Sequence, residues 1–378
     1  MISSNTNQIW QVTSKGIVSL EKDLGSVSMT DPNTLAGFIK WCAKNYPANR
    51  NGLIFWDHGG GSVSGYGYDE KYASSGSMSL AEIDDALTAG GVKFDFVGFD
   101  ACLMATTENA LMLADHADYM IASEETEPGV GWYYTNWLTA LSKNPSMKTT
   151  EIGRQIIDDF VETCNKECPG QKTTLSIVDL AELDATVPEA LRAFSADTCD
   201  RILNNEYQAV SNARSGAREF ATSSKIDQVD LVHLASNMGT KEGDALANAL
   251  LGAVKYNRTS SNMSNSYGLS IYFPFQKASS VDEAVETYEQ IGMDESYARC
   301  IQEFANLEIS GQVVSGGTTS PLPSLMGTYG GSSSLGTDVM MQLLGTFING
   351  NFGSISGLSA NNTGFFNDRA MTTEDVAA

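Results

Sequence analysis

The 378-residue sequence contains only three histidines, His58, His116 and His233, and six cysteines. Six cysteines over this length do not form the dense disulfide framework of a small secreted domain. Only 23 Lys and Arg residues stand against 46 Asp and Glu, which gives a net charge of −23. Phosphate binding needs a basic surface, so nucleic acid is not expected as a partner. No run of about 18 apolar residues predicts a membrane span, and the first residues lack the features of a signal peptide.

The composition is otherwise that of a folded protein. Hydrophobic residues make up 42% of the sequence and charged residues 18%, as in ordinary globular domains. Residues 1–308 carry regular hydrophobic patterns and predict the main domain. Residues 309–378 are rich in Gly, Ser and Pro and predict a linker followed by an incomplete C-terminal unit.

The most informative segment is 93–105. Phe94, Phe96, Val97 and Phe99 form a short apolar run that predicts a buried strand, followed directly by Asp-Ala-Cys at 100–102. Side chains alternate along an extended chain, so the side chains at 100 and 102 are expected on one side of it. A helix is predicted over 103–114, and its N-terminal dipole would favour the thiolate of the cysteine.

A second strand with a polar end supplies a base for this thiol. The apolar run at 53–56 is followed by His58 and then by Gly59, Gly60 and Gly61. Two neighbouring parallel strands ending in His58 and Cys102 would place an imidazole and a thiol in one crevice at the carboxyl edge of the sheet. Either residue alone is more simply explained as a strand end or a small buried side chain.

Trp-Asp-His-Gly at 56–59 followed by Phe-Asp-Ala-Cys at 99–102 resembles the paired motifs of the clostripain-like cysteine peptidases. The resemblance extends from about Trp10 to about Leu307. It implies the caspase–haemoglobinase fold, an α/β three-layer αβα sandwich with a mainly parallel sheet. It also implies endopeptidase activity after Arg or Lys, an extracellular or cell-envelope location, and no cofactor beyond a response to calcium, which the acidic loops leave open.

The resemblance also implies roles for individual residues. His58 is expected to be the base, Cys102 the nucleophile, and Asp100 the acid of the specificity pocket. The backbone N–H groups of Gly59 and Cys102 are the expected oxyanion donors. In the acidic segment 124–127, Glu125 and Thr126 are expected to bind substrate, although a solvated acidic loop explains the segment equally well.

The segment between Gly59 and Ser77 is rich in Gly, Ser and Tyr and predicts an exposed loop. Lys71 is the sole basic residue between Arg50 and Lys93. Family members often process themselves at such a place, so cleavage of the Lys71–Tyr72 bond is expected.

The remaining elements follow from hydrophobic spacing. Further strands are predicted at 120–123, 174–179 and 269–274, and a hairpin at 8–18. Helices are predicted at about 31–47, 79–91, 149–167, 181–203, 231–236, 246–255 and 296–307. His116 and His233 have apolar neighbours and no partner motif, so both are expected to be structural.

Two alternatives to the peptidase remain open. The chain could be a cysteine hydrolase of non-peptide substrates, or a non-catalytic binding module on the same fold. The second alternative draws on the N-terminus, because the apolar strand with which the family usually begins has no counterpart before Trp10. On that basis a position in the sheet and one wall of the crevice are expected to be missing.

Overall fold

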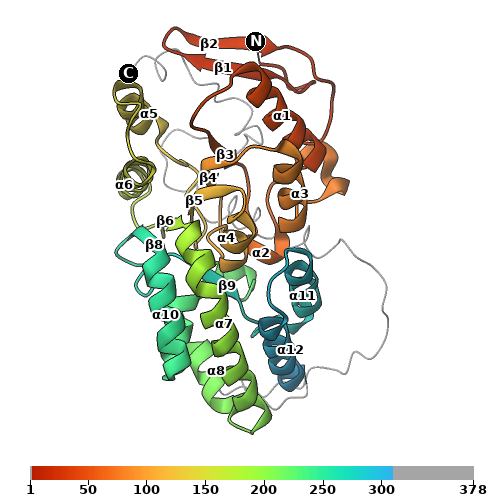
Figure 1. The fold of residues 1–378 in the computed structure, drawn as a ribbon, viewed down its shortest axis with the longest axis vertical. Helices are drawn as coiled ribbons and strands as arrows, with labels where there is room; N and C mark the ends of the chain where they lie inside the picture. The colour runs from red at the N-terminus through yellow and green to blue at the C-terminus, as the bar shows by residue number, and fades with distance from the viewer. Residues whose placement is uncertain (1, 310–378) are drawn as a thin grey trace.

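The structure, a computed structural model, describes residues 2–309 and is built on a five-stranded sheet (Figure 1). The strand order is β3-β4-β5-β6-β8. The strands are β3 (Gly52–Trp56), β4 (Phe94–Asp100), β5 (Ala117–Ala122), β6 (Thr174–Asp179) and β8 (Val254–Thr259). β3, β4 and β5 are parallel, whereas β6 is antiparallel to both of its neighbours. β8 therefore runs in the direction of β5, and the sheet is mainly parallel.

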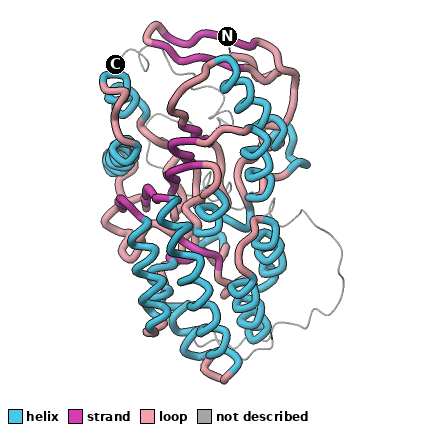
Figure 2. Tube along the Cα trace, in the orientation of Figure 1, coloured by secondary structure: helices cyan, strands magenta, loops and turns pink. Residues whose placement is uncertain are grey.

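Helices cover both faces of this sheet (Figures 1 and 2). α5 (Tyr134–Lys143) and α6 (Thr149–Glu167) pack on one face. The other face carries α1 (Pro32–Asn45), α3 (Leu80–Gly90), α4 (Thr107–Leu113), α7 (Leu180–Leu203) and α10 (Lys241–Ala253). The predicted three-layer αβα sandwich is confirmed.

Alternation along the strands fixes which side chains enter which layer. Phe96 and Ile121 pack with α5 and α6, whereas their neighbours Val97 and Met120 pack in the larger core on the opposite face. Successive side chains of a strand point to opposite faces, so a strand covered on both sides reads as a continuous apolar run. This is the reason that segment 94–99 was recognisable in the sequence.

The remaining elements lie around this sandwich. β1 (Ile9–Thr13) and β2 (Gly16–Glu21) form the predicted N-terminal hairpin. β7 (Gln228–Asp230) and β9 (Ser270–Tyr272) form a second small antiparallel sheet. Four further helices are α8 (Tyr207–Gly216), α9 (Leu231–Asn237), α11 (Val281–Gln290) and α12 (Glu295–Ile309), and short turns of helix are α2 (Gly61–Ser64), η1 (Glu70–Ser75), η2 (Thr222–Ser224) and η3 (Ala278–Ser280).

Several predicted boundaries differ from the structure. The helix predicted over 103–114 begins only at Thr107, because Thr106 is its N-cap and accepts a hydrogen bond from the Asn109 backbone N–H. The strand predicted at 269–274 lies outside the main sheet. The predicted helix at 246–255 gives way to β8 at Val254, and the exposed loop at 59–77 contains α2 and η1.

The edge of the sheet and the chain ends also bear on the sequence predictions. Among the described residues, β3 pairs with β4 alone and is an edge strand. Residues 310–378, where the linker and C-terminal unit are predicted, lie outside the described part of the chain, so the domain boundary stays a prediction. Within residues 2–309, no helix combines the length and apolar character needed to cross a membrane.

Candidate active site

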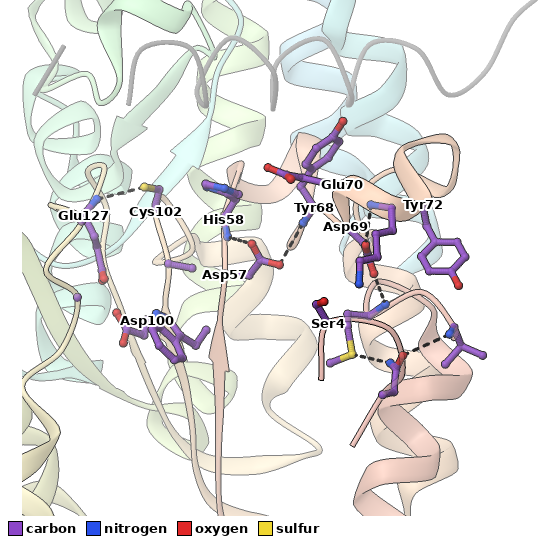
Figure 3. A pocket seen from close by; sticks show the side chains of 18 of the residues that line it. Ser4, Asp57, His58, Tyr68, Asp69, Glu70, Tyr72, Asp100, Cys102 and Glu127 are labelled. Carbon is purple, nitrogen blue, oxygen red and sulfur yellow. Dashed lines mark hydrogen bonds between the residues drawn. The ribbon is translucent and has the colours of Figure 1, made fainter. Parts of the chain in front are cut away.

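His58 and Cys102 lie at the carboxyl ends of adjacent strands. β3 ends at Trp56 and β4 at Asp100, and these two residues are paired in the parallel register. His58 and Cys102 each follow two residues later, so the shared register brings them to the same edge of the sheet. Both line one cleft of about 470 Å³, in which Figure 3 shows them side by side.

Close backbone approach at this edge depends on glycine. A Cβ added to Gly59 would lie 2.0 Å from the carbonyl oxygen of Cys102, which no real side chain tolerates. A Cβ on Gly61 would lie 2.1 Å from Oε1 of Gln228, and Gly61 has a φ of +73°. The glycines after the histidine therefore allow the first loop to lie directly against the second.

The thiol of Cys102 is turned toward the loop that follows β5. Its Sγ accepts a hydrogen bond from the backbone N–H of Glu127 at 3.2 Å, as drawn in Figure 3. Burial raises the pKa of this thiol to about 12. The expectation that a helix N-terminus favours the thiolate is wrong, because a turn with Leu103 at φ +67° separates Cys102 from α4.

Asp57 shapes the loop that carries His58. Its Oδ1 accepts the backbone N–H of His58 at 2.7 Å, and its Oδ2 accepts the backbone N–H of Tyr68 at 3.4 Å. Burial raises the pKa of this carboxyl group. Because these bonds involve backbone N–H groups, they fix the backbone conformation at His58. They also hold the segment after α2 at the same edge of the sheet.

Asp100 forms the floor of the cleft beside the thiol. Its side chain accepts hydrogen bonds from the backbone N–H of Trp132 at 3.2 Å and from the hydroxyl of Tyr134 at 2.9 Å. Burial raises its pKa. Gly131, at φ +61°, lets the loop that contains Trp132 approach Asp100, since a Cβ at this position would lie 3.1 Å from Oδ1 of Asp100.

The acid that joins Asp100 in the cleft is Glu127, not Glu125. Glu127 lines the cleft, and its Oε1 accepts the indole N–H of Trp132 at 3.3 Å. Glu125 and Thr126, predicted to bind substrate, are not among the lining residues. Glu125 is buried and accepts the backbone N–H of Ala221 at 3.0 Å and the ammonium of Lys172 at 3.4 Å. The acidic run was visible in the sequence, but not which member faces the cleft.

The expected processing site lies at the other end of the same cleft. Lys71 and Tyr72 line it together with residues of the N-terminal segment. Lys71 lies in η1, whose N-cap Asp69 accepts its backbone N–H at 3.0 Å. The backbone of Tyr72 leaves helical geometry at φ −124° and ψ 38°. Segments 3–7 and 26–29 supply lining residues on that side, so a wall exists where one was expected to be missing.

The other histidines have structural partners. Nε2 of His116 lies 2.5 Å from Oδ1 of Asp84, and Nδ1 of His233 accepts the backbone N–H of Arg218 at 2.9 Å. Within residues 2–309, no group of three or more His, Cys, Asp or Glu side chains is arranged to hold a metal ion.

Sequence reasoning missed Gln228, a buried residue whose side chain donates hydrogen bonds to segments next to the cleft. Its Nε2 donates to the carbonyl of Leu103 at 3.0 Å and to Oγ of Ser270 at 2.8 Å. A longer contact of 3.5 Å reaches the carbonyl of Glu124. Gln228 lies 125 residues beyond Leu103, and no local pattern in the sequence signals this contact.

Solved structures share this fold. An inactive zymogen C11 protease from Parabacteroides distasonis aligns with a TM-score of 0.56 and 22% identity, over 78% of this chain and 83% of that one. A secreted C11 cysteine protease from Bacteroides thetaiotaomicron, in complex with an irreversible peptide inhibitor, aligns with a TM-score of 0.54 and 19% identity, over 78% of this chain and 88% of that one. At these identities the likeness concerns the fold.

Sequence comparison leads to the family. Clostripain from Hathewaya histolytica is 32% identical over 124 residues, which cover 28% of this chain and 23% of that protein. The match thus spans less than a quarter of that relative's length. The profile of the clostripain family, Peptidase_C11, matches residues 5–328. The chain therefore belongs to the clostripain family.

Proposed function

We propose that the protein is an endopeptidase that cleaves after Arg or Lys, with Cys102 as nucleophile and His58 as base. The observation that carries this proposal is the common cleft. A thiol, an imidazole and two buried carboxylates, those of Asp100 and Glu127, line it at the ends of two adjacent parallel strands. The thiol and imidazole serve acyl transfer, and the carboxylates provide a pocket for a cation.

The reaction that fits this geometry has two steps. In the first, His58 takes the proton of the Cys102 thiol and Sγ attacks the scissile carbonyl. The C–N bond then breaks to leave a thioester, and His58 passes that proton to the leaving amine. In the second, water attacks the thioester, His58 accepts its proton, and the carboxylic acid product leaves. Backbone N–H groups of Gly59 and Cys102 would stabilise the oxyanion, each by about 3 kcal/mol.

The thiol has to turn before it can react. In the structure it accepts a hydrogen bond from the Glu127 backbone, and burial raises its pKa. A thiol in this position is a poor nucleophile at neutral pH. Rotation about χ1 toward His58 would bring it to the base, so the described conformation corresponds to a resting state of the enzyme.

Self-processing after Lys71 is part of the same proposal. Lys71 is a basic residue that lines the cleft of Cys102, and the Lys71–Tyr72 bond lies at an exposed, irregular point of η1. Intact mass spectrometry of purified protein would show two chains that meet at this bond. The Cys102→Ala variant is expected to stay a single chain, whereas cleavage in that variant would mean that another protease cuts the loop.

The experiment that tests the proposed function is an assay on fluorogenic peptides ending in Arg, Lys or a neutral residue, under reducing conditions. Wild-type protein is expected to hydrolyse the basic peptides, and Cys102→Ala and His58→Ala to lose this activity while keeping the wild-type melting temperature. Cys42→Ala, which removes another partly exposed thiol, is the matched control. Equal rates on neutral peptides would contradict the specificity, and activity in Cys102→Ala would contradict the nucleophile.

Location and calcium stay proposals as well. One solved relative is described as a secreted protease, and this supports an extracellular or cell-envelope location here. Fractionation of the producing cells would test it. Calcium dependence is tested by the same peptide assay with a chelator and with added calcium, and an unchanged rate would exclude it.

A further inference from the structure

Two buried carboxyl groups meet at the floor of the cleft. Asp100, at the end of β4, is 4% exposed, and Glu127, in the loop after β5, is 5% exposed. Trp132 lies between them and contacts both, with its backbone N–H on Asp100 and its indole N–H on Glu127. Trp132 therefore holds together two acids that come from different segments of the chain.

The hydrogen-bond donors in this pocket do not suffice for two carboxylates. Asp100 accepts on both oxygens, from Trp132 and from the hydroxyl of Tyr134. Glu127 accepts on Oε1, but its Oε2 is buried and has no hydrogen-bond donor among the described residues. Its carboxyl group is instead within hydrogen-bonding reach of the Asp100 carboxyl. Two carboxylate groups can form such a bond only when one of them carries a proton.

Among residues 2–309, no Lys or Arg side chain forms a salt bridge with Asp100 or Glu127. The same cleft is also lined by His58 and Lys71 and by the acids Asp57, Asp69 and Glu70. Burial and, to a lesser extent, the charge of one or both acids of the pair raise the pKa of Tyr66 from the segment after α2, Tyr134 from α5, Cys164 from α6, and Cys102. All four groups are neutral when protonated. Burial also raises the pKa of both acids, that of Glu127 well above its usual range because the Asp100 charge adds to it.

We propose that Glu127 is a specificity-determining residue that shares one proton with Asp100 in the empty pocket, and that the pair releases this proton when a basic side chain enters. The inference rests on the proposed function and deepens it. The carboxyl O–H bond breaks, the proton passes to solvent through the cleft, and the guanidinium or ammonium of the substrate takes its place. Both carboxylates then bind the cation.

A dependence of specificity on pH follows. At low pH the entering cation must displace a proton, which weakens binding of basic residues. As pH rises the proton leaves more readily, so the preference for a basic over a neutral residue increases by up to about tenfold per pH unit while one proton is released. A neutral residue of the same shape gains nothing from this ionisation.

The test compares two peptides that differ only in arginine or citrulline before the cleaved bond. The ratio of their kcat/KM values is measured between about pH 5 and about pH 8.5. His58 and Cys102 act on both peptides, so their own titrations cancel in the ratio. In wild-type protein the ratio is expected to rise about tenfold to a hundredfold across this range.

Glu127→Gln separates the shared proton from a simple acidic pocket. The glutamine amide donates to Asp100 permanently, as the protonated glutamic acid does, so the variant should match wild type at low pH. At high pH its ratio is expected to be about tenfold to a hundredfold lower. Glu167→Gln, which removes an exposed charge at the end of α6, is the control and should keep the wild-type slope. The same slope in Glu127→Gln as in wild type would overturn the proposal.

A second measurement does not depend on cleavage or on the folding of that variant. Binding of N-acetyl-arginine amide to Cys102→Ala is followed by calorimetry near pH 6 in two buffers of different ionisation enthalpy. Release of about one proton is expected, and release of none would refute the shared proton. Wild-type protein that cleaves neither peptide would refute the proposed function, and calorimetry would still decide the state of the carboxyl pair.

Discussion

Gln228 contacts two loops of the site and strand β9, and replacing it tests how these segments are held together. It lies at the start of β7, buried behind the cleft. Its Nε2 bonds the carbonyl of Leu103, the residue after the proposed nucleophile, and Oγ of Ser270. Its Oε1 packs against Gly61 in the loop after His58.

The Gln228→Met change keeps the shape of the side chain and removes its polar atoms. Two hydrogen bonds of normal length are lost, at 3.0 and 2.8 Å, and the third, at 3.5 Å, is too long to count. A buried acceptor left without its donor costs about 1 to 3 kcal/mol. The carbonyl of Leu103 is such an acceptor, and its residue is already in a left-handed conformation that costs about 1 kcal/mol. That strain is present with either side chain at position 228, so the unsatisfied acceptor alone predicts a loss of about 1 to 3 kcal/mol in the free energy of unfolding.

Two assays measure the effect. Urea unfolding followed by tryptophan fluorescence gives the change in stability, and the peptide assay gives kcat/KM. Displacement of the Leu103 turn should lower kcat/KM by about tenfold to a hundredfold. Gln208→Met, on the exposed side of α8, is the matched control and should cost less than about 0.5 kcal/mol. A Gln228→Met protein as stable and as active as that control would refute the reasoning.

Three further outcomes are expected. Gly59→Ala should abolish peptidase activity, because its Cβ would lie 2.0 Å from the Cys102 carbonyl oxygen, whereas Gly37→Ala, with open space around it, should not. Burial raises the pKa of Asp230 to about 6, and burial together with the charge of Asp230 raises the pKa of Glu124 well above its usual range. The folded protein thus binds more protons than the unfolded chain, so its free energy of unfolding should fall by about 2 to 3 kcal/mol between about pH 4 and about pH 6. Urea unfolding of Asp230→Asn should show a flatter dependence of stability on pH. An unchanged dependence would contradict this prediction. The rate of Cys102 alkylation by iodoacetamide, followed by mass spectrometry, should be low at neutral pH and should rise toward alkaline pH, because burial raises the thiol pKa to about 12. Rapid labelling at pH 6 would show that the thiol is not in the resting position.

The sequence by itself determined the sandwich and the meeting of His58 with Cys102. Apolar runs at 53–56 and 94–99 are local patterns, and their lengths and residue types suffice to predict buried strands. The parallel pairing of such strands brings their carboxyl ends together whatever lies elsewhere in the chain. The helix predicted at 79–91 is equally local, and α3 begins at Leu80 with Ser79 as its N-cap.

Only the tertiary structure decided how the side chains at this edge are oriented. Glu125 turns to Ala221, 96 residues away, and Glu124 turns to Gly268, 144 residues away, which leaves Glu127 to face the cleft. The thiol of Cys102 likewise points to a backbone N–H of the next loop, and not along a helix axis. These contacts join segments that are distant in the sequence, and hydrophobic periodicity carries no information about them. The chain alone therefore places His58 and Cys102 at one edge of the sheet. Packing between distant loops determines which acids line the cleft and which way the thiol is turned.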